Sequence, residues 1–136
     1  MARIVVNVDV ADLERGTRFY TRAFGLRIGR RFGSDAIELV GAEVSLYLLV
    51  ASGAPHPGAT EPRRYERHWT PVHLDFVVDD IEVAVAAALA EGARLEAPSS
   101  QHRYGKLAVL ADPFGNGFCF LQFEGRGYDE IATAVG

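Results

Sequence analysis

The segment TPVHLDFVVDD, residues 70–80, decides the fold of this chain. An apolar, β-branched run ends there on two aspartates, immediately before a stretch with helical periodicity. The segment RIVVNVDVAD, residues 3–12, has the same design. In each case the pattern predicts a strand followed by a helix, with an aspartate accepting hydrogen bonds from the exposed backbone N–H groups at the helix start.

The two segments are the openings of an internal repeat. Asp12 precedes Asp80 by 68 positions, and Gly25 and Gly92, which end the following helical patterns, are 67 positions apart. Agreement within one residue predicts two modules of similar structure. Neither module has enough helix to cover its own sheet, so each is expected to need the other.

Each module is expected to contain a strand, a helix and three further strands, which places the chain in the α+β class as two βαβββ modules in a pseudo-twofold repeat. Pairing of the modules would give a curved mixed sheet around a cleft lined from both. The expected strands are 4–10, 26–32, 37–40 and 44–51 in the first module and 72–78, 93–97, 106–111 and 117–123 in the second; the expected helices are 13–24, 81–90 and a short one at 128–135.

The length of 136 residues predicts a single domain with a sizeable core. Proline, glycine and charged residues mark a linker at about 53–69. Its length favours a flap at a site or an interface, and a plain crossover between modules explains it equally well. The expected boundaries are module one at about 1–52, module two at about 70–124 and a C-terminal tail at 125–136.

The composition argues against several classes of partner. With a formal net charge of −4 and no element dominated by Lys or Arg, the chain lacks the basic face that nucleic acid requires. The single cysteine, Cys119, allows no internal disulfide and fits a reducing compartment. Neither a signal-peptide pattern nor an apolar run of about 20 residues is present. We therefore expect a soluble, cytoplasmic protein without a membrane partner.

The turn DPFGN, residues 112–116, opens the last expected strand. Its aspartate can hold the backbone in an Asx turn, its proline fixes φ and its glycine permits a positive φ. With the Phe-Tyr pair at residues 19–20 and His73 in the second opening strand, the turn resembles the vicinal oxygen chelate superfamily of glyoxalases, bleomycin-resistance proteins and extradiol dioxygenases. The resemblance covers essentially the whole chain and implies one glyoxalase-like domain, residues 1–136.

Metal-dependent members of the superfamily take their ligands from the first and last strand of each half. The resemblance places these positions at Val5, Tyr47 (or Ser45 if the register shifts by two), His73 and Cys119. Valine cannot coordinate a cation and only His73 keeps the expected residue type, so the resemblance implies no complete set of hard ligands. A trigonal site of His73, Cys119 and Tyr47 is the alternative, although its geometry would be unusual for the superfamily.

The leading hypothesis is a protein without metal or other cofactor that binds a small, partly aromatic organic molecule in its cleft, such as an antibiotic-like compound that it sequesters. Aromatic side chains would wall the cleft and a few polar groups would orient the ligand. Strand alternation places Asn7 and Asp9 on the face of Val5. If that face lines the cleft they can bond a ligand, and if it packs against the helix the backbone must satisfy them. The predicted ligand-binding residues are Asn7, Tyr47, Trp69, His73, Tyr104 and Cys119, with Phe118 or Phe120 as a further wall.

Several of these residues also have structural explanations. Cys119, between two phenylalanines, is favoured as a small buried apolar residue. Trp69 can instead pack at the junction of the modules. Tyr104 belongs to a polar loop with His102 and Arg103, and exposure to solvent explains that loop as well as closure over a ligand does.

The second hypothesis is a metal-dependent glyoxalase-like lyase or dioxygenase, in which a divalent metal polarises adjacent substrate oxygens. Its ligands would be His73 together with residues among Glu38, Glu43, His68 and His102. A third hypothesis is a structural role in which the homodimer surface matters. The resemblance implies a homodimer, and leaves open whether the modules pair within one chain or are exchanged between chains.

Overall fold

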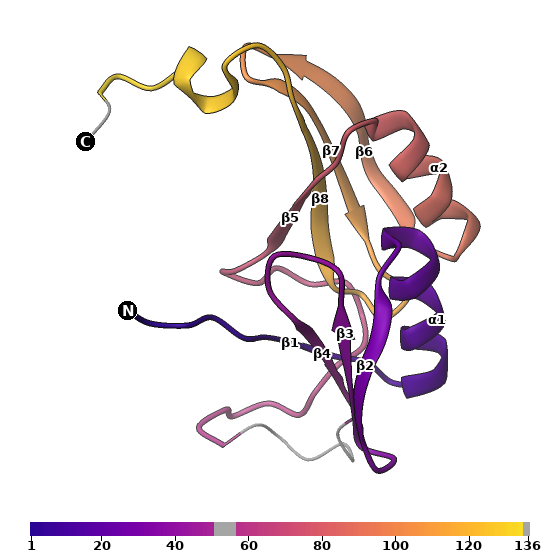
Figure 1. Cartoon of the computed structure of the whole chain (residues 1–136). Coiled ribbons are helices and arrows are strands. Elements are labelled where there is room, and N and C mark those ends of the chain that lie inside the picture. The colour runs from indigo at the N-terminus through magenta and orange to yellow at the C-terminus, as the bar shows by residue number, and fades with distance from the viewer. Residues whose placement is uncertain (51–56, 135–136) are drawn as a thin grey trace.

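The structure, a computed structural model, describes residues 1–50 and 57–134. Two four-stranded sheets each carry one helix, and both helices lie on the same side of the molecule, leaving the opposite sheet faces without a helix (Figure 1). The first module contains β1 (Val6–Asp9), α1 (Leu13–Phe24), β2 (Arg27–Phe32), β3 (Ala36–Val40) and β4 (Leu46–Leu49), in the sheet order β1-β4-β3-β2. The second contains β5 (Leu74–Val77), α2 (Ile81–Ala90), β6 (Arg94–His102), β7 (Gly105–Ala111) and β8 (Gly117–Phe123), in the order β5-β8-β7-β6.

The register of the strands confirms the predicted α+β fold of two βαβββ modules. Asn7 of β1 pairs in parallel with Tyr47 of β4, and Asp75 of β5 pairs in parallel with Cys119 of β8. Asn7 and Asp75 lie 68 positions apart, the offset predicted from the two opening segments. Among the described residues no strand pair joins the two sheets. The modules are held together by packing of α1 against α2, by aromatic contacts of α1 with β5 and β8, and by polar contacts.

The caps of the helices follow from local sequence. The carboxylate of Asp12 accepts from the backbone N–H of Arg15 at 2.9 Å, and Gly25 ends α1 with a φ of 68°. Asp80 accepts from the N–H groups of residues 82 and 83 at the start of α2. These caps satisfy N–H groups that have no partner within the helix. Among the described residues, no helix is long and apolar enough to cross a bilayer.

Two larger differences from the prediction lie in β6 and in the C-terminal tail, while strands such as β1 and β5 are shorter at their ends than predicted. β6 continues to His102, beyond the predicted end at 97, because register shifts near Ala97 accommodate Pro98, which has no N–H to donate. The predicted helix at 128–135 is wrong, since residues Gly127–Glu130 form only a 3-10 turn, η1, in which glycine alone is buried. Residue 135, residues 53–56 of the linker and the predicted end of a strand at 51 lie outside the described residues.

Aromatic rings fill the core between helices and sheets. The ring centroid of Phe24 in α1 lies 4.3 Å from that of Phe76 and 5.4 Å from those of Phe118 and Phe120. Phe118 and Phe120 are 3% and 0% exposed, and burying such a side chain contributes about 1.5–3 kcal/mol. Both are therefore core residues.

The DPFGN turn ties the second module to the first. Asp112 is buried, and its carboxylate accepts from the Tyr20 hydroxyl at 2.6 Å and from the backbone N–H groups of Phe114 and Asn116 at 2.8 and 2.9 Å. The Asn116 side chain donates to Asp112 and to the carbonyl of Asp9 in β1. Burial, with the charge and hydrogen bond of Asp112, raises the pKa of Tyr20 well above its usual value. The turn is thereby bonded to both α1 and β1.

Candidate functional site

A cavity of about 520 Å³ lies where β1, β5, the linker and the DPFGN turn meet. We call it the linker cavity. Its volume falls in the range of small-molecule sites, roughly 300–1,000 Å³. Both modules line it, with valine, leucine and phenylalanine side chains on one hand and the polar residues Asn7 and His73 on the other.

A second cavity, of about 550 Å³, adjoins the first and shares Val6, Leu74 and Phe76 with it. It extends toward the β3–β4 connection, so we call it the β3–β4 cavity. Its lining is mainly apolar, with Glu43 and Asp75 as its carboxylates. The two cavities together form the cleft between the modules that the repeat predicts.

The linker forms one wall of the linker cavity, and ionic contacts hold it in place. Arg63 Nε lies 2.6 Å from Asp9 Oδ2 of β1. Arg67 bonds Glu96 of β6 at 2.8 Å through Nε and the carbonyl of His68 at 2.6 Å through Nη1. The described part of the linker is therefore fastened to both modules.

His73, Asp75 and Cys119 converge on the helix-free face of the second sheet. His73 Nε2 lies 3.1 Å from Asp75 Oδ1, and one donor atom of each of the three residues falls within 4.8 Å of the others. Asp75 is absent from the predicted site. The signal for it was available, because strand alternation puts residue 75 on the same face as His73.

The thiol of Cys119 is held in its protonated form. Burial raises its pKa to about 11, with further contributions from the charge and hydrogen bond of Asp75 and from the charge of Glu96. A thiolate is the form that attacks electrophiles and binds metals. In this environment Cys119 is an unreactive, buried apolar residue, as its position between two phenylalanines predicts, and is poorly suited to act as a nucleophile.

We expect Cys119 to be alkylated slowly. At pH 8 a thiol with a pKa of about 11 is roughly one part in a thousand thiolate, so reaction with iodoacetamide should be about a hundredfold slower than that of free cysteine. Asp75→Asn should speed the reaction, whereas Asp79→Asn, at the exposed end of the segment, should not. Equal rates for the folded and the denaturant-unfolded protein would contradict the expectation.

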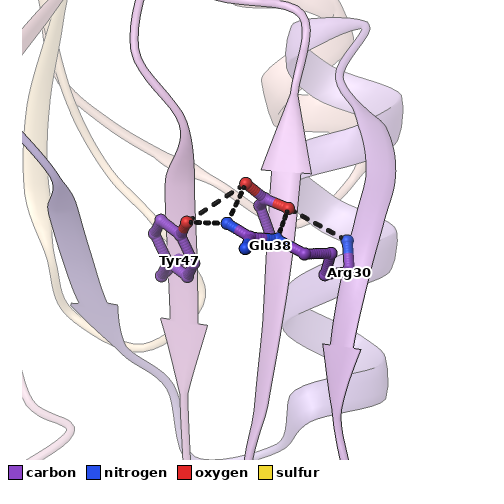
Figure 2. Close-up of polar contacts among 3 residues, drawn as sticks. All are labelled: Arg30, Glu38 and Tyr47. Atoms are coloured by element: carbon purple, nitrogen blue, oxygen red, sulfur yellow. Dashed lines mark hydrogen bonds and ion pairs between the residues drawn. The ribbon is translucent and has the colours of Figure 1, made fainter.

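A polar cluster on the first sheet replaces the predicted aromatic wall at Tyr47. Figure 2 shows Arg30, Glu38 and Tyr47 from β2, β3 and β4 pointing toward one another. Arg30 donates to both carboxylate oxygens of Glu38, at 2.8 and 3.0 Å, and to the Tyr47 hydroxyl at 2.8 Å. The Tyr47 hydroxyl donates in turn to Glu38 at 3.1 Å. Tyr47 is thus a member of an ion-pair network.

We expect the carboxyl group of Glu38 to titrate near pH 2. The hydrogen bonds of Arg30, with that of Tyr47 and the charge of Arg30, lower the pKa of Glu38 from 4.5 to about 2 despite partial burial. Because the folded pKa is the lower one, the stabilisation is complete above about pH 4.5 and is lost as the pH falls toward 2. Carboxyl ¹³C NMR should show the low midpoint, rising toward 4.5 in Arg30→Gln and staying low in Arg31→Gln. A wild-type midpoint near 4.5 would contradict the network.

The remaining predicted residues fall in different places. Asn7 and His73 line the linker cavity. Trp69 is 81% exposed and lines neither cavity. The Tyr104 ring stacks on His102, with centroids 5.0 Å apart, and its centroid lies 5.3 Å from that of Tyr128 in η1. Among the alternative metal ligands, His68 lines the linker cavity and Glu43 the β3–β4 cavity.

The donor atoms do not fit the four metal-ligand positions that the superfamily implies. Val5 has no donor atom in its side chain, and the hydroxyl of Tyr47 is bonded to Arg30 and Glu38. What the second module offers is a mixed set of imidazole, carboxylate and thiol. Such a set suits a thiophilic transition metal better than a hard cation.

The comparisons with known proteins agree with this fold. One similar solved structure is a glyoxalase/bleomycin resistance protein/dioxygenase family enzyme from Burkholderia phytofirmans PsJN, with 23% identity over 88% of this chain and 97% of that one and a TM-score of 0.69. A glyoxalase/bleomycin resistance protein from Albidiferax ferrireducens T118 has 22% identity over 88% of this chain and 97% of that one, with a TM-score of 0.67. The fosfomycin resistance protein FosX from Listeria monocytogenes has 14% identity over 97% of this chain and 98% of that one, with a TM-score of 0.72. At these identities the likeness shows the fold alone. No curated protein matches the chain.

The family itself is established by the sequence. The model of the glyoxalase-like domain matches residues 5–121, which include both modules, the linker and the DPFGN turn. The match agrees with the resemblance carried by that turn and by the repeat. The chain therefore belongs to the glyoxalase-like domain family.

Proposed function

We propose that this protein binds a small, partly aromatic organic molecule in the cleft between its modules, without a metal or other cofactor. The observation that carries the proposal is the linker cavity: about 520 Å³, lined by both modules and by the linker. Valine, leucine and phenylalanine side chains form the apolar part of its wall, and polar groups, Asn7 and His73 among them, can fix the orientation of a ligand.

One further observation supports binding without a metal, and another supports an antibiotic-like ligand. The first module contributes no ligand at position 5, and it commits Tyr47 to the network with Arg30 and Glu38. The fold is also that of proteins described as bleomycin and fosfomycin resistance proteins. Sequestration of an antibiotic-like compound is the form of binding that we propose for this chain.

Elemental analysis and a binding screen together test the proposal. Purified protein after mild dialysis should hold less than a stoichiometric amount of any metal, and a panel of aromatic compounds should contain ligands that raise the melting temperature. Asn7→Ala should weaken such a ligand, whereas Thr21→Ala on α1 should not. One equivalent of tightly held metal would overturn the metal-free proposal, and a panel without any ligand would count against binding.

A second candidate function is metal-dependent lyase or dioxygenase chemistry. It is favoured by one observation, the convergence of His73, Asp75 and Cys119 within 4.8 Å. Metal retained by the wild type and lost in His73→Ala, with turnover of an α-ketoaldehyde thiol adduct or a catechol, would establish it. Equal metal content in the two proteins would count against it.

We also propose that the protein acts as a cytoplasmic homodimer, in which a second copy borders the helix-free sheet faces. Exposed apolar side chains support an interface, since Ile4 and Val72, each two residues before the first strand of a module, are 72% and 75% exposed. Sedimentation should give a mass near twice 14.8 kDa. A monomer mass at micromolar concentration would contradict the proposal.

A further inference from the structure

The linker cavity has an asymmetric charge. Its ionisable lining residues include one carboxylate, Asp9, against two arginines and two histidines. The chain as a whole has the opposite balance, with 18 acidic and 14 basic residues apart from histidine. The cavity is therefore lined by an excess of cationic and protonatable groups in an acidic protein.

Two of the four bases are already engaged with carboxylates. Arg63 lies 2.6 Å from Asp9, so these two charges offset each other. His73 lies 3.1 Å from Asp75, whose side chain belongs to the neighbouring cavity. The excess of cationic and protonatable groups in the lining is therefore due to the other two bases, Arg64 and His68, which both come from the linker.

Arg64 is held only loosely by the protein itself. Its ionic contact is with Glu61, at 3.7 Å, and the side chains of Arg64 and Glu61 are 51% and 73% exposed. An exposed pair at this distance contributes little, about 0–1 kcal/mol. The guanidinium can therefore turn toward an anion in the cavity at small cost, and it offers the planar donor set that matches a carboxylate.

The ring of His68 has one nitrogen committed and one left for the cavity. Nδ1 lies 2.8 Å from the carbonyl of Glu66, and because a carbonyl only accepts, Nδ1 carries a proton. Nε2 is then the nitrogen that can meet a ligand, as a donor when the ring is an imidazolium. In that protonated form its donor would add to that of Arg64, which lines the same cavity.

The part of the wall that the strands form is mainly apolar. Val6, Val8 and Leu49 come from the first module, and Leu74, Phe76 and Phe118 come from the second. An occupant that matches both walls carries an apolar body and an anionic group. Each charge-assisted hydrogen bond to the anion is stronger than a neutral one, and more so where the apolar wall excludes water.

We infer that the ligand of the linker cavity is an organic anion, with its carboxylate or an equivalent group bound by Arg64 and His68. This inference rests on the proposed function and adds to it the charge and the orientation of the ligand. The apolar body lies against β1 and β5, and the anionic group faces the linker.

A matched pair of probes tests the inference. Naphthalene-1-carboxylate and naphthalene-1-carboxamide share size and ring system and differ in charge. Calorimetric titration at pH 7 should show the carboxylate binding at least tenfold more tightly. Arg64→Gln should remove about tenfold from the carboxylate affinity and leave the amide affinity unchanged, while Arg31→Gln, an exposed arginine on β2 that lines neither cavity, should alter neither.

The possible results distinguish failure of the anionic preference from failure of the proposed ligand binding in the cleft. Equal binding of the two probes, or equal loss in Arg64→Gln, would overturn the anionic preference and leave cleft binding in place. Binding of neither probe would overturn both. Perturbation of the Asn116 side-chain amide signals by the carboxylate would place it in the linker cavity, since that amide lines it.

Discussion

Replacing Asp112 with alanine is expected to lower the free energy of unfolding by about 3–5 kcal/mol. The carboxylate accepts from the Tyr20 hydroxyl, two backbone N–H groups of the DPFGN turn and the Asn116 side chain. Alanine supplies no acceptor, and a buried donor left without a partner costs about 1–3 kcal/mol. Because these donors belong to both modules, the loss should appear in one cooperative transition, measured by denaturant titration.

Two further variants serve as comparisons for Asp112→Ala. Tyr20→Phe removes a single donor and should cost only about 1–2 kcal/mol. Asp35→Ala, at an exposed turn between β2 and β3, should change stability by less than about 0.5 kcal/mol. A cost for Asp112→Ala no larger than that for Asp35→Ala would show that the turn does not join the modules.

The second large effect is expected at Gly115, where the linker lies directly against the DPFGN turn. Its φ is +83°, and a Cβ at this position would lie 2.5 Å from the carbonyl carbon of Glu66 and 2.7 Å from the backbone nitrogen of Arg67. Gly115→Ala therefore combines an unfavourable backbone conformation with a clash against main chain. We expect it to cost about 2–4 kcal/mol and to push the linker away from the cavity.

Gly33→Ala is the matched control for that variant. Gly33 also has a positive φ, +59°, but nothing lies within 4 Å of its Cβ position. It should cost only the backbone term of about 1–2 kcal/mol. Trypsin should cleave the linker arginines faster in Gly115→Ala and at the wild-type rate in Gly33→Ala. Equal stability and equal cleavage in the two variants would show that the linker is not seated on the turn.

The features that the sequence predicted are those with local causes. Asp12 and Asp80 cap helices through groups two or three residues away, and Gly25 ends α1 by its own backbone conformation. The repeat needed only the spacing of such signals. The family resemblance at the DPFGN turn had the same origin, since an Asx turn is built from adjacent residues.

The site was harder to predict because its contacts are distant in sequence. Arg30 meets Glu38 and Tyr47 only after β2, β3 and β4 have paired, and no spacing rule joins these positions. The exposure of Trp69 depends on the path of an irregular linker, which no periodicity describes. Asp75 is different, since alternation along β5 was sufficient to place it beside His73.

The charged wall of the linker cavity has a consequence for how ligand preference can change. Arg64 and His68 belong to a segment without helix or strand, whereas the bonds that join the modules run through Asp112, Tyr20 and Asn116. Substitutions at the first pair alter what the cavity attracts without disturbing the bonds of the second group. The residues that hold the modules together are thus separate from those that set ligand preference, so substitutions at a few linker positions can change the preference while the scaffold stays the same.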